Sequence, residues 1–335
     1  MNTHRVWVCS ELREDFGGLQ LREQPALPCP PGQVRVRVLA AALNFPDLLM
    51  AQGRYQHRPA LPFVPGLEGA GRVVECGDGV GWPARGDAVC WTARLGAFSE
   101  ELLAPAQELR ALPAGFGMAE GAAYGVAALT AWEALVRRGD LQHGETLLVH
   151  GAGGGTGLAA VQLGRHLGAT VIATASSPAK LDAARAAGAT HTLLLAAGAQ
   201  GLGEAVKTLS GGRGADVVFD PVGGDVFDAS LHCIAWGGRL LVVGFASGRI
   251  GSVSANLPLI KGFAVIGVRA GEAARRDPER GLQNRQAVQA LAARGLFRPH
   301  IGARFGFEQL PQAYRALAGR GVAGKVVIDM PAKSR

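Results

Sequence analysis

The sequence predicts an α/β protein in which a doubly wound parallel sheet follows a mainly β segment. Three observations indicate this fold: strand-like alternation in the first third, regular strand–helix alternation in the middle, and a shorter mixed tail. The chain has 335 residues, of which 48% are hydrophobic and 18% charged, so it can fill about two cores. This composition excludes a disordered chain, because such chains are poor in apolar residues and rich in charge.

The first third of the chain has the pattern of short strands. Residues 34–38 (VRVRV) alternate apolar and charged side chains, as a strand with one solvated face does. Prolines and glycines between residues 59 and 87 favour short strands and turns over long helices. With strand-like runs near residues 71–74 and 88–91, the segment fits a compact, partly open barrel.

From about residue 118 the pattern changes to helices alternating with strands. Alanine-rich helical sequence runs to Arg138, and a later helix has Ser177 as its N-cap and stops at Gly188. The predicted strands are 146–150, 170–175, 215–220 and 239–244, and the other predicted helices are 156–167, about 201–210 and about 225–235. Such alternation implies a parallel sheet with helices on both faces.

The tail after about residue 255 departs from this rhythm. A strand is predicted at 263–268, and Asp277-Pro278 caps a helix that Gly295 ends. A shorter helix at 307–318 then precedes an apolar strand at 325–329. The tail therefore predicts a return to mixed structure.

Charge, cysteine use and the N-terminus narrow the possible functions. The net charge is +7, but the arginines are scattered, which favours a solvated charged surface over a nucleic-acid site. The five cysteines are far apart and form no CxxC pair, so we expect reduced core residues in a reducing compartment. The N-terminus lacks the apolar stretch of a signal peptide. The longest runs without charged residues, 146–164 and 186–203, are both broken by glycines, so neither is predicted to span a membrane. We expect a soluble, cytoplasmic protein.

The strongest motif is VHGAGGGTGLAAVQLGRHLGA, residues 149–169. It follows an apolar strand and opens a helix, which is where a dinucleotide fingerprint belongs. The first position of the GxGxxG pattern is alanine, but the two later glycines still allow close phosphate approach and tight helix packing. We therefore predict a dinucleotide site rather than a flexible loop, lined by Ala152, Gly154, Gly155, Thr156 and Gly157.

The end of the second strand indicates which dinucleotide binds. A sheet that binds NAD usually has an acid there for the ribose 2′-hydroxyl, but residues 170–175 end without one. Ser176 can donate a hydrogen bond to a 2′-phosphate and Lys180 adds a positive charge one helical turn later. The sequence thus favours NADPH over NADH, with Thr174, Ser176 and Lys180 at the site.

Further motifs follow one another along the chain. They are AALNFPDLLMAQGRY (41–55), LPFVPGLEGAGRVV (61–74), DPVGG (220–224), GGRLLVVGFASG (237–248) and GKVVI (324–328). With residues 149–169, they resemble the zinc-free quinone oxidoreductases of the medium-chain dehydrogenase/reductase superfamily, the family that includes zeta-crystallin. The resemblance runs nearly end to end. It implies a Rossmann-type dinucleotide-binding domain over 119–254, inserted into a GroES-like catalytic domain built from 1–118 and 255–335.

The resemblance also allows the zinc positions to be compared. Zinc-dependent relatives hold the catalytic metal with a Cys, a His and a further Cys or Asp, where this chain has Asn44, Leu67 and Val126. None of these supplies the thiolate or imidazole that zinc prefers. The four-cysteine lobe of those relatives also has no counterpart after Cys90. We predict that the protein binds no metal.

Without zinc, a carbonyl substrate needs hydrogen bonds or its own electrophilicity, and quinones and conjugated enones accept hydride with modest help. The resemblance implies that Asn44 and Tyr55 give this help. Asn44 matches a residue near the nicotinamide ribose, and Tyr55 matches a tyrosine thought to assist protonation in similar enoyl reductases. Plain packing is the alternative for Tyr55. Asp47 and Glu68 either brace the fold or touch the ligand.

The resemblance implies further cofactor contacts at Thr130, Gly223, Gly244, Phe245 and Arg320. Thr130 would lie near the nicotinamide carboxamide, and Arg320 would reach the 2′-phosphate. One departure is Leu195, where several relatives have a tyrosine beside that phosphate. The 2′-phosphate would then be held by Ser176, Lys180 and Arg320 alone.

Together these features predict an NADPH-dependent reductase that moves hydride to a quinone or an α,β-unsaturated carbonyl. Reduction of an enoyl thioester or a 2-alkenal is the alternative within the family. The alternative from another class is a nucleotide-sensing or RNA-binding protein with little turnover, although the aromatic content of 6% offers little for base stacking. The expected partner is a small quinone or enone, with no membrane and no nucleic acid. The resemblance also implies a homodimer, in which strand 263–268 is either a free edge or a core strand.

Overall fold

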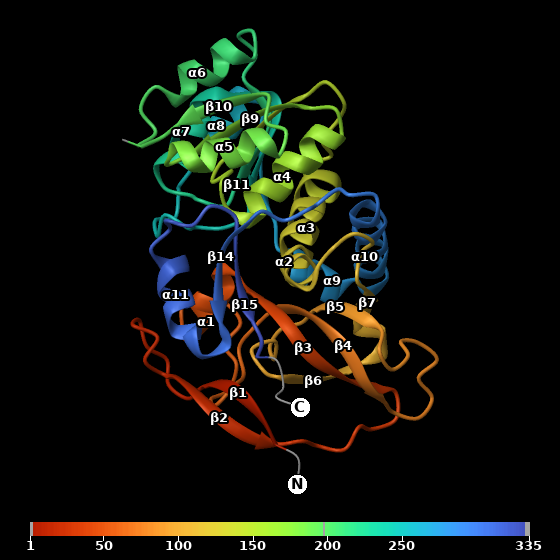
Figure 1. Ribbon diagram of the computed structural model, residues 1–335. Helices are drawn as coiled ribbons and strands as arrows, with labels where there is room; N and C mark the ends of the chain where they lie inside the picture. The colour runs from red at the N-terminus through yellow and green to blue at the C-terminus, as the bar shows by residue number, and fades with distance from the viewer. Residues whose placement is uncertain (1–2, 197, 332–335) are drawn as a thin grey trace. The chain divides into compact units, whose positions relative to one another are not determined.

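The computed structural model describes residues 3–196 and 198–331 (Figure 1). The chain divides into a first unit, residues 1–126 and 301–335, and a second unit, residues 127–300. The fold class that the sequence predicts is confirmed: one unit is built mainly of strands, and the other has a parallel sheet covered by helices.

The first unit contains a seven-stranded sheet and a separate two-stranded one. The large sheet has the order β14-β15-β3-β4-β5-β7, with β6 also paired to β3, and β1 pairs with β2. These strands are β1 (Thr3–Cys9), β2 (Leu19–Pro25), β3 (Gln33–Leu43), β4 (Glu68–Cys76), β5 (Ala88–Thr92), β6 (Glu101–Pro105), β7 (Leu109–Ala111), β14 (Ile301–Gly306) and β15 (Lys325–Asp329). The helices are α1 (Phe45–Ala51), α2 (Met118–Ala123) and α11 (Leu310–Ala318), with short 3₁₀ turns η1 (Ala106–Glu108) and η3 (Phe307–Gln309).

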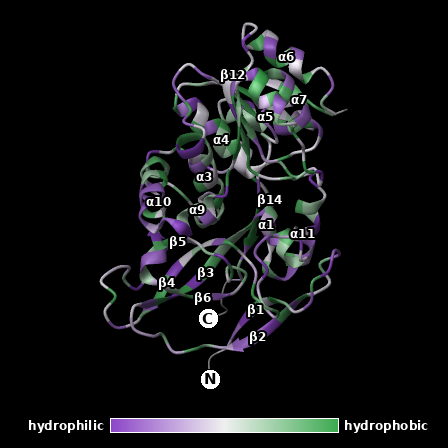
Figure 2. Cartoon of the chain, turned by 180° about the vertical axis from the view of Figure 1, so that it is seen from behind, coloured by the Kyte–Doolittle hydropathy of each residue, from purple (hydrophilic) through white to green (hydrophobic). Residues whose placement is uncertain are grey.

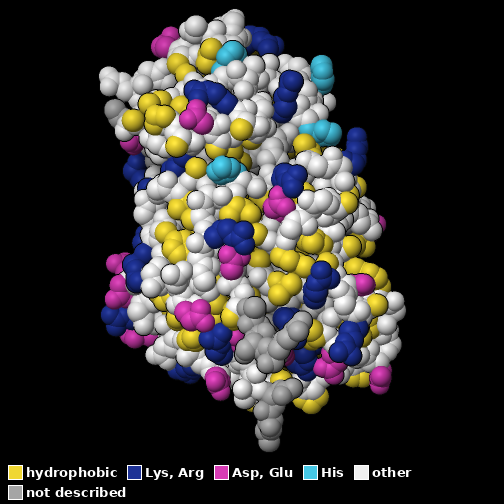
Figure 3. Space-filling model, viewed as in Figure 1, with side chains coloured by type: hydrophobic (Ala, Val, Ile, Leu, Met, Phe, Trp, Pro, Cys, Tyr) yellow, Lys and Arg dark blue, Asp and Glu magenta, His cyan; other side chains and the backbone are white. Residues whose placement is uncertain are grey.

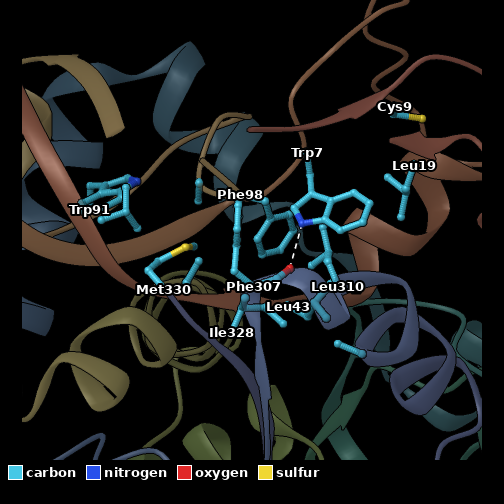
Figure 4. Close-up of a cluster of buried hydrophobic side chains, with 14 of the residues drawn as sticks. Trp7, Cys9, Leu19, Leu43, Trp91, Phe98, Phe307, Leu310, Ile328 and Met330 are labelled. Atoms are coloured by element: carbon cyan, nitrogen blue, oxygen red, sulfur yellow. Dashed lines mark hydrogen bonds between the residues drawn. The ribbon is translucent and has the colours of Figure 1, made fainter. Parts of the chain in front are cut away.

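The core of the first unit is rich in aromatic side chains. Trp7 lies on β1, and its indole nitrogen donates a hydrogen bond of 2.8 Å to the Phe307 carbonyl oxygen. Figure 4 shows this bond among Phe98, Leu310 and Ile328, which come from segments far apart in the sequence. The β1–β2 pair is more polar: β2 is exposed after its first residue and is largely hydrophilic in Figure 2. Because β1 and the segment from Phe307 to Met330 both contribute side chains to this core, residues 301–331 belong with the N-terminal segment.

The second unit contains a six-stranded parallel sheet of order β10-β9-β8-β11-β12-β13. Its strands are β8 (Thr146–Val149), β9 (Thr170–Ala175), β10 (His191–Leu194), β11 (Ala215–Asp220), β12 (Ile234–Val242) and β13 (Ala264–Gly267). Its helices are α4 (Gly155–His166), α5 (Pro178–Ala186), α6 (Leu202–Leu209), α7 (Asp225–Cys233), α8 (Asn256–Lys261), α9 (Ala270–Arg276) and α10 (Pro278–Ala293). Helix α3 (Gly125–Trp132) and the π-helical turn η2 (Glu133–Arg138) precede β8. This strand order is that of a doubly wound dinucleotide-binding fold, whose ligands bind at the carboxyl ends of the strands.

The chain returns to the first unit later than the sequence predicts. The prediction places the return at residue 255, whereas the structure places it at Ile301. The reason is that β13 pairs in parallel with β12 as the sixth strand of the sheet. Helix α10 is also fixed within the second unit, because the Asn284 side chain donates to the Glu133 carboxylate over 3.0 Å.

Figure 3 shows Lys and Arg side chains interspersed with Asp and Glu on the viewed face, rather than gathered in one area. All five cysteines are free thiols, and Cys9, Cys90 and Cys233 are buried. Within residues 3–196 and 198–331, every helix is too short or too polar to cross a bilayer.

Candidate active site

A buried cluster of polar side chains lies in the first unit and joins Asn44, Glu68 and Lys325. The Lys325 ammonium donates to Asn44 Oδ1 over 2.6 Å and to Glu68 Oε1 over 2.7 Å. The Asn44 amide nitrogen donates to the same Glu68 oxygen over 3.0 Å. All three side chains are buried, with exposed fractions of 7%, 1% and 5%. We call these three residues the Asn44–Glu68–Lys325 triad.

Strand pairing brings the triad together. Asn44 follows the last residue of β3, Glu68 begins β4 and Lys325 begins β15. Strand β3 lies between the other two, with Leu43 opposite Val326 and Ala42 opposite Glu68. The three polar residues therefore meet at one end of the central strands, although nearly the whole chain separates Asn44 from Lys325. Such a long-range juxtaposition is fixed by sheet register and cannot be found from a local motif.

The triad is extended by Asp47 and by the start of α3. The second oxygen of Glu68 accepts a hydrogen bond of 2.8 Å from the Val126 backbone nitrogen. Asp47 is fully buried, and its carboxyl accepts from the Asn44 nitrogen over 2.9 Å and the Gly66 nitrogen over 3.2 Å. Burial raises the pKa of Asp47 to about 7, although these hydrogen bonds and the Lys325 charge oppose the shift. Protonated Asp47 leaves one negative and one positive side chain in the cluster, so its charge is balanced.

The hydrogen bonds limit what Asn44 can do. Its amide nitrogen donates to Glu68 and also to the Ala42 carbonyl oxygen over 3.3 Å, so both N–H groups are engaged. Asn44 Oδ1 accepts from Lys325 and keeps one further lone pair. For Asn44 to polarise a substrate carbonyl, one of these buried hydrogen bonds would have to break, and this role stays a prediction. Its oxygen can still accept a hydrogen bond from a ligand hydroxyl.

The three positions that match zinc ligands all lie around Glu68. Asn44 bonds to its carboxylate, Leu67 precedes it in the chain, and the Val126 backbone nitrogen donates to it. The Leu67 and Val126 side chains are hydrocarbon and the Asn44 side chain is already hydrogen-bonded, so these positions do not fit a zinc ion. A buried lysine ammonium supplies the positive charge in this region instead.

Tyr55 and Arg320 are two other predicted residues of the first unit, outside the hydrogen-bonded triad. Tyr55 follows α1 and is half-buried, with its side chain packed against the aromatic core. Arg320 lies in the turn after α11, where it is exposed and has a left-handed backbone with φ of 56°. Roles for these two residues in the reaction stay predictions.

The glycine-rich turn of the second unit has the predicted strand–turn–helix arrangement. Strand β8 ends at Val149, and Gly154 is the N-cap of α4. A Cβ at Gly157 would overlap the Gly151 carbonyl oxygen, so Gly157 lets the helix pack against its own entry turn. A Cβ added to Gly154 would have only the Gly151 carbonyl oxygen nearby, at 3.4 Å, so the space in front of Gly154 is open. The turn and the unpaired N–H groups of α4 fit the pyrophosphate of a dinucleotide.

Lys180 lies directly against this turn. Its Nζ atom donates to Ser176 Oγ over 3.4 Å, and its stem covers Gly153 so closely that a Cβ there would lie 2.6 Å from Lys180 Cγ. Ser177 and Pro178 begin α5 as the sequence predicts, which brings Lys180 over the turn. Ser176 is exposed at the end of β9 and no acid stands there. These two side chains thus form a polar, positively charged pair beside the glycine turn.

Thr174 lies near the end of β9 with its side chain buried. Its hydroxyl is buried and lies 2.9 Å from His150 Nδ1, and only its carbonyl oxygen faces the turn, where it accepts from the Ala152 nitrogen over 2.9 Å. On the other side, His150 Nε2 lies 2.7 Å from the hydroxyl of Ser230, which itself donates to the Val226 carbonyl oxygen. His150 Nε2 must therefore be the donor, and Nδ1 accepts from Thr174. Burial lowers the pKa of His150, which keeps the imidazole neutral. The Thr174 side chain braces β9 against this histidine.

The remaining predicted residues of the second unit include a group at the ends of β11 and β12. Gly223 has φ of 68°, and a Cβ on it would lie 3.1 Å from the Phe245 ring. The Gly223 nitrogen donates to the Asp220 carboxylate over 2.9 Å, and the Gly244 nitrogen donates to the Asp220 carbonyl oxygen over 3.3 Å. The structure thus brings Gly223, Gly244 and Phe245 together, as the sequence predicts. Thr130 lies on α3 and is half-buried.

Sequence reasoning missed two buried groups, Lys325 and His150. Lysine is scarce in this chain, and a lysine directly before the apolar run VVI is unusual at the start of a buried strand. His150 likewise ends the apolar strand that leads into the glycine turn. In both cases the sequence signal was a polar residue directly adjoining an apolar run that forms a buried strand.

Comparisons with known proteins agree with this geometry. Residues 30–134 match the alcohol dehydrogenase GroES-like domain, and residues 155–290 match the zinc-binding dehydrogenase family. The chain is 35% identical to the quinone oxidoreductase-like protein 2 of Mus musculus, over 98% of this chain and 92% of that protein. It is 37% identical to the pikromycin polyketide synthase component PikAII of Streptomyces venezuelae, over 91% of this chain and 8% of that protein. A solved structure of mycobacterial Rv1454c complexed with NADPH has a TM-score of 0.88 and 28% identity, covering 97% of this chain and 99% of that one. The chain therefore belongs to the medium-chain dehydrogenase/reductase superfamily of oxidoreductases, among its quinone oxidoreductase-like members.

Proposed function

We propose that this protein is an NADPH-dependent reductase that transfers hydride to a quinone or an α,β-unsaturated carbonyl. The observation that carries the proposal is the Ser176–Lys180 pair, which lies beside the glycine turn where an acid would favour NADH. The NADPH in the Rv1454c structure and the name of the mouse relative support the same assignment.

The chain's own residues have separate tasks in binding the cofactor. Bound NADPH supplies the hydride from its nicotinamide ring. The turn from Ala152 to Gly157 and the N-terminus of α4 would receive the pyrophosphate. Ser176 and Lys180 would hold the 2′-phosphate, assisted by Arg320. Thr130, Gly223, Gly244 and Phe245 are proposed to line the nicotinamide half.

The triad has the properties expected of a group that orients the nicotinamide ribose. Asn44 Oδ1 can accept a hydrogen bond from a ribose hydroxyl while its amide nitrogen stays bound to Glu68. We propose that Tyr55 assists protonation after hydride transfer. We also propose that the reaction needs no zinc, because a quinone or enone accepts hydride without a strong Lewis acid.

A substrate panel with purified protein tests the proposal. NADPH oxidation is measured with 1,4-benzoquinone, 9,10-phenanthrenequinone, 2-alkenals and crotonyl-CoA, after metal analysis and with chelator present. We expect turnover with quinones or alkenals, undiminished by the chelator, and tighter binding of NADPH than of NADH in fluorescence titrations. Turnover confined to crotonyl-CoA would instead support enoyl-thioester reduction. Equal affinity for the two nucleotides, or stoichiometric zinc, would contradict the proposal.

We further propose that two copies associate through β13. This strand ends the parallel sheet, and it is partly exposed along its length. Exposed apolar side chains lie on it and on the elements before it, namely Val265, Trp236, Leu259 and Ile260. An open edge with apolar flanks is a pairing site for another strand. Sedimentation velocity should therefore give a dimer that Val265→Lys weakens, whereas a monomeric wild-type protein would exclude this interface.

A further inference from the structure

We propose that Lys325 is a positioning residue for the hydride-transfer reaction. Its ammonium group fixes the Asn44 carboxamide so that the oxygen is presented to the nicotinamide ribose and the nitrogen is held by Glu68. This inference rests on the proposed function, in which Asn44 contacts that ribose. It adds a residue that lies at the far end of the chain from Asn44.

The hydrogen bonds of the triad determine which way the amide faces. An asparagine amide can turn by half a revolution, which exchanges its oxygen and nitrogen. Lys325 is a donor only, so the atom 2.6 Å from its Nζ must be the Asn44 oxygen. Glu68 is an acceptor, so the atom 3.0 Å from its Oε1 must be the Asn44 nitrogen. A donor on one side and an acceptor on the other thus allow a single orientation.

Burial makes this orientation rigid. Because Lys325 and Glu68 are 5% and 1% exposed, water does not replace a lost partner of Asn44. Glu68 is itself held by the Val126 nitrogen through its other oxygen, so its carboxylate cannot turn to follow a displaced amide. Lys325 is anchored at the start of β15, which is paired to β3 directly before Asn44. The two partners therefore form a rigid frame around one amide.

Removing the lysine donor should loosen the amide. With Lys325→Met, the Asn44 oxygen loses its only donor from the protein, and the amide is held only through its nitrogen, by Glu68 and the Ala42 carbonyl oxygen. An amide held from one side can tilt, so its oxygen is no longer fixed in position. The ribose would lose a defined acceptor in part of the population. A misplacement of the reactive groups by about 1 Å can slow a reaction about 100-fold, so the expected loss of hydride-transfer rate is about 10- to 100-fold.

The test is a double-mutant cycle on the full-length protein. Wild type, Asn44→Ala, Lys325→Met and the double variant are compared by single-turnover oxidation of NADPH with 9,10-phenanthrenequinone. We expect both single variants to slow hydride transfer, and the double variant to match Asn44→Ala within about twofold, because Lys325 acts through Asn44. NADPH and NADH should be weakened by the same factor, since the nicotinamide half is common to both. If Lys325→Met slowed hydride transfer by the same factor in the wild-type protein and in the Asn44→Ala variant, the inference would be overturned.

A second readout does not depend on the reaction. In protein with ¹⁵N-labelled asparagine side chains, the Asn44 amide signals are assigned by their loss in Asn44→Ala. Lys325→Met should shift or broaden these signals in the absence of nucleotide, because the amide is then held only through its nitrogen and its oxygen has lost its donor. Unchanged Asn44 signals would overturn positioning by Lys325 even if the rate fell.

Two further variants separate positioning from folding and from failure of the proposed function. Lys325→Met/Glu68→Gln removes both charges, so it leaves no unpaired buried ion and should fold; it is expected to slow hydride transfer as Lys325→Met does. Arg304→Met breaks an exposed pair with Asp329 on the neighbouring strands β14 and β15, and should leave the rate within about twofold of wild type. A normal rate in Asn44→Ala would refute the proposed ribose contact, whereas a slow Asn44→Ala with a normal Lys325→Met would refute only the role of Lys325.

Discussion

Replacing Glu68 by alanine is expected to lower the free energy of unfolding by about 3–5 kcal/mol, because it leaves the Lys325 ammonium buried without a counter-ion. Lys325 would keep only its hydrogen bond to Asn44 Oδ1, and the Val126 nitrogen and the Asn44 amide would each lose an acceptor. Few single substitutions away from the aromatic core should cost as much. Denaturant unfolding at neutral pH measures the change.

The matched controls vary charge and burial one at a time. Glu68→Gln keeps an acceptor for the Val126 nitrogen but removes the charge, so its loss of stability should be smaller than that of Glu68→Ala. Asp329→Ala breaks the exposed pair with Arg304 in the same sheet and should cost less than about 1 kcal/mol. If Glu68→Ala were no more destabilising than Asp329→Ala, the buried triad would not hold the ends of β3, β4 and β15 together.

Replacing Gly153 by alanine is expected to weaken NADPH about 10- to 100-fold and NADH far less. The new Cβ would overlap the Lys180 stem, whose Cγ lies 2.6 Å from that position, so the lysine must move away from the turn. The loss equals that of a charge-assisted hydrogen bond to the 2′-phosphate, which only NADPH has. The Gly153 backbone does not have a positive φ, so alanine adds no backbone strain of that kind. Fluorescence titration with both nucleotides measures the effect.

Two further variants identify the cause. In the Lys180→Gly background, Gly153→Ala should add little, because the Lys180 Cβ, Cγ and Cδ atoms that it would overlap have already been removed. Gly154→Ala should instead weaken NADPH and NADH alike, because its Cβ projects into the open space in front of α4 where the shared pyrophosphate is proposed to bind. Equal weakening of both nucleotides by Gly153→Ala would show that the whole turn had moved and would exclude a specific role for Lys180.

Local signals in the sequence predict the second unit well. The bounds of β9 and β11 agree with the predicted strands, and α5 begins after Ser177 with Pro178 in its first turn. These features depend on residues within a few positions of one another. Strand β13 is different, because its apolar residues predict a strand but not its partner. Its place beside β12 therefore moved the expected domain boundary by more than forty residues, from 255 to Ile301.

The candidate site also has one part that local sequence signals predict and one part that they do not. The glycine turn and Ser176–Lys180 lie close in sequence, so their arrangement could be predicted from pattern alone. The triad could not, because Asn44, Glu68 and Lys325 meet only through the register of three strands. Thr174 shows a third limit: its position at the end of β9 was predicted, but the buried His150 that draws its hydroxyl inward was not.

Two of the buried titratable groups, Asp47 and His150, have opposite effects on stability when the solution is acidified. Asp47 of the first unit has its pKa raised to about 7, so the folded state holds a proton that the unfolded chain releases above its ordinary value of 3.8. Its contribution to stability is therefore greatest in acid and is lost as the pH rises through about 7. The pKa of His150 in the second unit is lowered from its ordinary value of 6.5. Below that value the unfolded chain binds a proton at His150 that the folded state does not bind, so acid opposes folding. Acid thus favours folding through Asp47 and opposes it through His150.

This opposition makes cooperativity itself depend on pH. Calorimetric unfolding should approach a single transition at about pH 8 and broaden or divide at about pH 5, where the second unit loosens first. His150→Asn should restore a sharper transition in acid, and equal sharpness of the wild-type transition at both pH values would contradict this expectation. The buried imidazole of His150, next to the glycine turn, would then determine which of the two units unfolds first in acid.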